Sequence, residues 1–175
     1  MFNEIALLRQ RLTQHGTLDV MHASHLWTVT FEWLQPAAKS QVETAEDLIG
    51  IALPKDYAEF LTNVSNGATL FKDIKYGQWG FKLYGTDEVV TKQQFWGINF
   101  PKTWNTRLLA FAETLGEANV LVLNLDRGSR DSSGCAVLEG NAIDPVSNWP
   151  TLSRTFHEWL DHLVTAQGDK YWEWK

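Results

Sequence analysis

The histidines near the C-terminus are the first residues whose types and spacing could do chemistry. The stretch "HEWLDH" resembles the zinc-protease pattern His-Glu-x-x-His, in which two histidines four residues apart share one face of a helix. Here His157 and His162 are five residues apart, which separates them by about 140° around a helix. The spacing therefore predicts two histidines at the solvent edge of a helix, without a shared metal ion.

A second pair, His22 and His25, stands three residues apart, and this spacing could hold a metal ion if the segment were helical. No cysteine lies nearby and no third ligand is evident. Cys135 lies in an apolar, strand-like run, which predicts an unreactive core thiol. No Gly-x-Ser-x-Gly, Walker loop or Gly-x-Gly-x-x-Gly pattern is present. We therefore predict no catalytic residues, no metal site, no cofactor and no enzyme, with an unrecognised site around His22 and His25 as a minor alternative.

Composition narrows the class of protein further. The chain has 175 residues, of which 44% are hydrophobic and 21% charged, and this predicts one domain with a single core over residues 1–175. A single cysteine excludes an intramolecular disulfide and favours the cytoplasm. No apolar run approaches the roughly 20 residues that cross a bilayer. The net charge of −6, without a cluster of Lys and Arg, argues against nucleic acid as a partner.

The acidic residues are concentrated between residues 113 and 144, where six acids stand against two arginines. Such a segment could contact a basic protein, or it could be a solvated sheet edge that charge protects from aggregation. The chain also contains nine tryptophans, a residue type enriched at interaction hot spots and in cores alike. The candidate partner-binding residues are Trp96, Trp104, Asp126, Asp131 and Trp172.

Hydrophobic periodicity predicts the elements that must position these residues. Helices are expected over residues 2–12, 40–49, 54–64, 86–96 and 152–166, and strands over 78–85, 107–113, 119–126 and 134–140. Residues 25–34 are expected to form either a strand or an irregular segment before Pro36. Ser40 and Glu43 stand in capping-box register, and Thr86 is the expected cap of its helix. Residues 97–106 are expected to form a loop. A run of adjacent strands predicts an α+β fold with a mainly antiparallel or mixed central sheet flanked by helices.

Residues 166–175 form an aromatic tail that contains Tyr171, Trp172 and Trp174. The alternating pattern predicts that the tail docks on the body as a strand. An exposed aromatic hook for a partner is the alternative.

The helix over residues 54–64 begins at a proline that suits the first helical turn. Tyr57, Phe60, Leu61 and Val64 follow on one apolar stripe. The pair Asn66-Gly67 predicts a left-handed exit from the helix. This pattern describes a structural element rather than a catalytic site.

The stretch "LPKDYAEFLTNVSNGATL" resembles the signature of the SUKH superfamily, which includes fungal cell-wall-assembly regulators and bacterial immunity proteins. Two further stretches, "LLAFAETLGEANVLVLNLD" and "LSRTFHEWL", resemble the central strands and the closing helix of that family in the expected order. The resemblance covers residues 40–165 and leaves residues 1–39 as an N-terminal extension with a helix. The family-motif residues, taken as structural, are Leu53, Pro54, Tyr57, Phe60, Leu61, Asn66, Gly67, Phe156 and Trp159.

The sequence departs from the family pattern in an enlarged connection over residues 91–106. The resemblance implies a non-enzymatic α+β domain that binds protein. Bacterial members are commonly immunity proteins that neutralise toxin domains, many of them nucleases, and fungal members act as scaffolds. We therefore expect an immunity protein with a protein partner, without nucleic-acid or membrane binding. A cytoplasmic scaffold or regulator without a toxin partner is the alternative.

Overall fold

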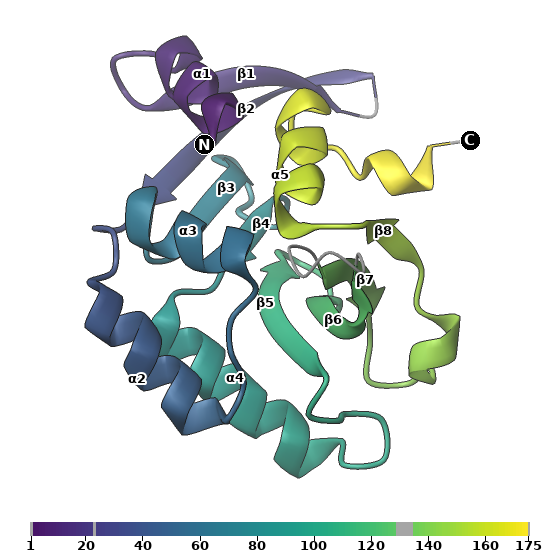
Figure 1. Ribbon diagram of the computed structural model, residues 1–175. Coiled ribbons are helices and arrows are strands. Elements are labelled where there is room, and N and C mark those ends of the chain that lie inside the picture. Colours follow the sequence, from purple (N-terminus) through teal and green to yellow (C-terminus); the bar gives the residue numbers. More distant parts are fainter. Residues whose placement is uncertain (1, 23, 129–134, 175) are drawn as a thin grey trace.

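The computed structural model describes residues 2–22, 24–128 and 135–174 and has one antiparallel sheet of eight strands (Figure 1). The strands lie in the sheet in the same order as in the chain, so each strand pairs with its sequence neighbour. They are β1 (Thr17–His22), β2 (His25–Trp33), β3 (Ala68–Asp73), β4 (Phe81–Leu83), β5 (Leu108–Thr114), β6 (Val120–Gly128), β7 (Cys135–Gly140) and β8 (Thr151–Ser153). The α+β prediction is confirmed.

Five α-helices accompany the sheet: α1 (Asn3–Arg11), α2 (Lys39–Ile49), α3 (Lys55–Asn63), α4 (Thr86–Asn99) and α5 (Phe156–Thr165). Two short 3-10 helices, η1 (Val146–Asn148) and η2 (Tyr171–Glu173), follow β7 and α5. Helices α1, α3 and α5 meet through aromatic rings, since Phe2 lies 5.6 Å from Phe60 and 6.3 Å from Phe156. Helices α2 and α4 lie side by side at the opposite end of the molecule from α1 (Figure 1).

Helix α5 forms because its apolar residues recur on one face. Its five buried residues are Phe156, Trp159, Leu160, Leu163 and Val164. Thr155 caps the helix, since its Oγ1 accepts a hydrogen bond of 2.9 Å from the backbone N–H of Glu158. Trp159 packs edge to face against Phe111 of β5 and Phe81 of β4. Helix α5 therefore covers this face of the sheet, and the core lies between the helix and β4 and β5.

Some elements differ from the sequence predictions. His22 and His25 face each other across the β1–β2 hairpin, so they are not two ligands on a helix. Helix α4 continues to Asn99 because Gly97 keeps a φ outside the left-handed region and does not end it. At the start of α2, the side chain that reaches back is Gln41, whose Oε1 accepts from the N–H of Ala38 at 2.8 Å, rather than Glu43. Strands β1, β3 and β8 were not predicted.

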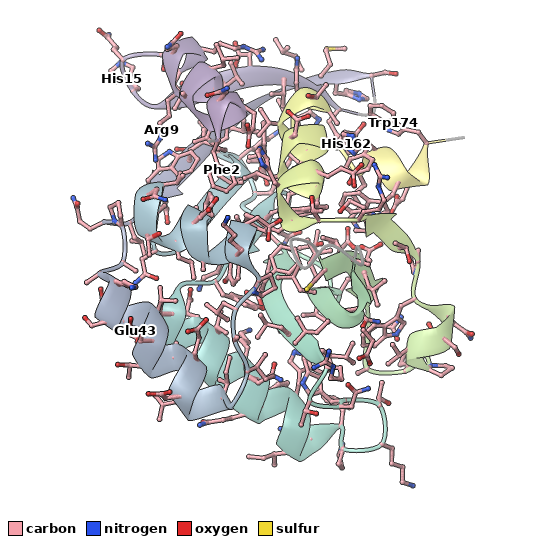
Figure 2. All side chains as sticks on the ribbon, in the orientation of Figure 1. Phe2, Arg9, His15, Glu43, His162 and Trp174 are labelled. Atoms are coloured by element: carbon pink, nitrogen blue, oxygen red, sulfur yellow. The ribbon has the colours of Figure 1, made fainter. Side chains whose placement is uncertain are left out.

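The C-terminal segment docks as the 3-10 helix η2 instead of a strand. Asp169 accepts a hydrogen bond from Trp174 Nε1 at 3.2 Å and lies 2.9 Å from His22 Nδ1. Figure 2 shows Trp174 in this segment, and Phe2 near the start of α1 on the side of α3 and α5. Within the part of the chain that the structure describes, no helix is long and apolar enough to cross a membrane.

Candidate partner-binding surface

Tyr57 of the family motif joins three elements through a chain of hydrogen bonds. Its buried hydroxyl donates to the backbone oxygen of Tyr84 at 2.7 Å. The hydroxyl of Tyr84 donates to Glu113 Oε2 at 2.7 Å, and Lys92 Nζ lies 2.7 Å from the same oxygen. Burial raises the pKa of both tyrosines, and for Tyr84 the bond to Glu113 raises it further. Both hydroxyls thus stay protonated and hold α3 and α4 to β4 and β5.

Asp56 performs a second joining role that the sequence reasoning did not assign. Its Oδ2 accepts a hydrogen bond of 3.0 Å from the backbone N–H of His157 in the first turn of α5. A carboxylate at a helix N-terminus is favourable because that end of the helix carries a partial positive charge. Burial raises the pKa of Asp56, while the hydrogen bond to His157 works in the opposite direction. The acid of the motif therefore links α3 to α5.

Asn66 and Gly67 act differently from the exit predicted for them. Helix α3 ends at Asn63, and Asn66 reaches across to α4, where its Oδ1 accepts from the N–H of Thr86 at 2.9 Å and its Nδ2 donates to Thr86 Oγ1 at 3.2 Å. Gly67 has a φ of +94°, and a Cβ there would lie 2.8 Å from the backbone nitrogen of Gly85. Asn66 thus caps a helix 20 residues away, and Gly67 permits the close approach.

The remaining motif residues support this framework from the core. Leu53, Phe60, Leu61, Phe156 and Trp159 are all buried. Pro54 precedes the first residue of α3. The motif residues therefore connect α3, α4, α5 and the sheet to one another. A surface for a partner would have to be formed by other residues.

Two of the predicted partner-binding residues lie in the core, which corrects their expected exposure. Trp96 and Trp104 are only 8% and 7% exposed, and their rings stack 5.2 Å apart with an interplanar angle of 19°. Phe100 and Trp149 extend this aromatic cluster. The physical reason is that α4 runs through residue 99, which turns Trp96 towards β5 and the connection that carries Trp104. Neither ring is available to an incoming protein in this arrangement.

The other three candidates have different surroundings. Asp126 is exposed and lies 2.7 Å from Arg107 Nε. Trp172 is partly buried, donates from Nε1 to Glu139 Oε2 at 2.9 Å and packs against the ring of Phe81. Asp131 lies outside the residues that the structure describes. Asp126 and Trp172 contact different neighbours from the stacked pair of Trp96 and Trp104, so these four described residues do not form one contact cluster.

Four of the acids between residues 113 and 144 are paired within the molecule, namely Glu113, Glu117, Asp126 and Glu139. Lys170 Nζ lies between Glu117 and Glu139 and is 2.9 Å from the latter. Burial alone would lower the pKa of Lys170, but its hydrogen bonds to the two glutamates raise it overall. Glu113 is paired with Lys92 in the same way. These carboxylates hold the tail and the sheet together.

The exposed residues of α2 and α4 include both apolar side chains and acids, and we call the surface that these two helices expose the α2–α4 face. It comprises Asp47, Leu48, Asp87, Phe95 and Ile98. Leu48, Phe95 and Ile98 are 63%, 49% and 77% exposed. Within the described ranges, neither Asp47 nor Asp87 has an ion-pair partner. Phe95 and Ile98 lie within the connection over residues 91–106, in which the aromatic residues predicted to bind a partner, Trp96 and Trp104, are buried.

His22, which the sequence offered as part of an alternative site with His25, has a structural role. His22 stacks on Trp79 with ring centroids 4.6 Å apart and bonds to Asp169. Over residues 2–22, 24–128 and 135–174, no group of three or more His, Cys, Asp or Glu side chains is placed to hold a metal ion. The histidine therefore fixes the tail to the first hairpin.

A meandering antiparallel sheet, closed on one face by helices that a Tyr-and-Asn framework joins, defines an α+β domain. This chain belongs to the SMI1 / KNR4 family (SUKH-1), whose family model matches residues 36–162. It is also similar to the uncharacterized protein YnaB of Bacillus subtilis (strain 168), with 28% identity over 144 residues that cover 82% of this chain and 88% of that protein. The resemblance drawn from the sequence is confirmed.

Proposed function

We propose that this chain is a non-enzymatic, cytoplasmic protein-binding module, specifically an immunity protein that neutralises a cognate toxin domain. The observation that carries the proposal is the family match over residues 36–162, because bacterial members of this family are commonly immunity proteins. The α2–α4 face supports it, since it offers apolar side chains beside unpaired carboxylates. Toxins that cleave nucleic acid present basic surfaces, and such surfaces are attracted to acids of this kind.

The test is direct binding to a defined candidate. The purified chain is immobilised and challenged with the C-terminal domain encoded by the adjacent upstream gene, at 50 mM and 500 mM salt. An immunity protein binds that domain with a nanomolar dissociation constant, more weakly at the higher salt, and blocks its activity. An unrelated toxin domain serves as the control. Absence of binding and of protection refutes the immunity function.

A cytoplasmic scaffold or regulator is the second candidate, because the same family includes proteins of that kind. It predicts a growth phenotype when the gene is deleted in cells that lack any toxin gene beside it. An immunity protein predicts no phenotype in that background, since nothing is left to neutralise. Deletion in strains with and without the upstream gene therefore separates the two functions.

A further inference from the structure

We infer that the α2–α4 face binds its partner through an apolar side chain flanked by Lys or Arg. The inference rests on the proposed protein-binding function and adds the location of the surface and the chemistry of the partner. The face lies at the end of the molecule away from α1 and the C-terminal tail (Figure 1).

Leu48 is the centre of this face because it borders two grooves between the helices. With Asp87 and Val90 it lines a groove of about 170 Å³. With Gln94 and Gly97 it lines a second groove of about 270 Å³. Ile98 follows Gln94 by one helical turn, so a second exposed apolar side chain lies on α4 beside the larger groove. The face therefore offers two exposed apolar side chains, Leu48 and Ile98, next to two grooves.

The charge along α2 and α4 is biased towards negative because the lysine of each helix is already engaged by a carboxylate. Lys39 of α2 lies 3.7 Å from Glu43, and Lys92 of α4 is bonded to Glu113 on β5. Asp47 precedes Leu48 directly, and Asp87 lines the same groove as Leu48. An apolar contact bordered by two unpaired carboxylates favours a partner whose anchor is flanked by basic residues.

Gly97 gives a further reason for a close contact. Glycine inside a helix is unfavourable relative to alanine, and a Cβ at Gly97 would meet no atom within 4 Å. Folding therefore offers no steric reason for glycine here. Its missing side chain leaves the floor of the larger groove open, which allows another chain to approach the helix backbone.

A second exposed apolar group, on the first hairpin, lacks this bias in charge. Met21 and Leu26 face each other across the β1–β2 hairpin, and Ile74 lies near them, its N–H bonded to the oxygen of Thr28. Asp19 and Lys72 border that group with opposite charges. It therefore makes a suitable control surface, with exposed side chains of similar size.

The first experiment tests the surface without a toxin. The ¹⁵N-labelled chain is titrated with the blocked hexapeptide RKLLKR, and with EELLEE as the control peptide. We expect shift changes from RKLLKR alone, confined to residues 44–48 and 87–98, and their loss in Ile98→Glu but not in Ile74→Glu. Changes spread over other surfaces, equal changes with both peptides, or no changes overturn the inference.

The second experiment uses the domain encoded by the adjacent upstream gene. We expect Ile98→Glu to weaken its binding at least tenfold and Ile74→Glu less than twofold, an effect typical of a central contact against a distant one. Gly97→Ala should weaken binding several-fold while it raises the melting temperature by about 2 °C, because alanine favours the helix. Binding that neither Ile98→Glu nor Gly97→Ala affects overturns the inference and leaves the immunity function intact.

If the wild-type chain does not bind the upstream domain, the peptide titration decides alone. A localised response to RKLLKR then supports the surface, while the immunity function fails. The two proposals are thereby separated.

Discussion

Asn66→Ala should destabilise the protein because it removes the cap of helix α4, which begins 20 residues later in the chain. The side chain of Asn66 accepts from the N–H of Thr86 at 2.9 Å and donates to its hydroxyl at 3.2 Å. Loss of a side-chain cap costs about 1 kcal/mol. Loss of a second hydrogen bond to a buried group costs about another 1 kcal/mol. Because Thr86 is buried, water cannot easily replace either bond, and the expected loss is about 2 kcal/mol.

The matched variant is Asn66→Asp, which keeps the accepting oxygen and adds a negative charge near the N-terminus of α4, where it is favourable. The hydroxyl of Thr86 can rotate to donate to the new carboxylate. We expect Asn66→Asp to lose less than about 1 kcal/mol, since only the amide donor is removed. The difference between the two variants measures the capping interaction itself.

Urea denaturation followed by circular dichroism gives both free energies of unfolding. A loss of about 2 kcal/mol corresponds to a fall in melting temperature of about 4–8 °C for a chain of this size. Equal losses in the two variants, or a loss below about 0.5 kcal/mol in Asn66→Ala, would refute the reasoning. The motif asparagine would then have only a local role in the turn.

Three further predictions concern buried polar groups. Lys170→Ala should lower the free energy of unfolding by about 2–3 kcal/mol, because it leaves Glu139 without its cation. Residues 169–174 should then show faster hydrogen exchange, and unchanged exchange would contradict the prediction. Burial opposes ionisation of Asp73, but hydrogen bonds from four backbone N–H groups hold its pKa below the ordinary value. The carboxylate of Asp73 therefore stabilises the fold at neutral pH, and this stabilisation is lost as pH falls through its folded-state pKa. The difference in free energy of unfolding between wild type and Asp73→Asn should therefore shrink from pH 5 to pH 2. A constant difference would contradict the prediction. Burial raises the pKa of Cys135 to about 11, so Ellman's reagent at pH 8 should react much faster after unfolding, and equal rates would disprove a protected thiol.

Helices α3 and α5 could be predicted because their apolar residues recur with the helical period and all point into one core. Strand β3 could not, because Phe71 has a φ of +55° and interrupts the two-residue alternation that identifies a strand. Strand β8 has only three residues, too few for a period to be visible. Local pattern thus predicts regular elements and fails where the backbone is irregular or the element is short.

The candidate surface was predicted less well than the fold for a different physical reason. The sequence identifies Trp96 and Trp104 as large aromatic residues, but burial depends on which side of α4 faces the sheet. That orientation is set by the packing of α4 on α2 and β5 and by the stacking of Trp96 on Trp104, whose ring in turn contacts Trp149 from a distant part of the chain. In the same way, the acids near residue 117 resemble a free surface until Lys170, 53 residues later, is placed between them.

The order of the strands has a consequence for synthesis on the ribosome. Because each strand pairs with its sequence neighbour, most of the sheet can form as the chain emerges, with little waiting for distant segments. Phe2 and His22 are exceptions, since their partners Phe156 and Asp169 emerge about 150 residues later. The first helix and hairpin can therefore begin to pack early, on Phe60 and β3, but they gain their last contacts only after Phe156 and Asp169 have been made.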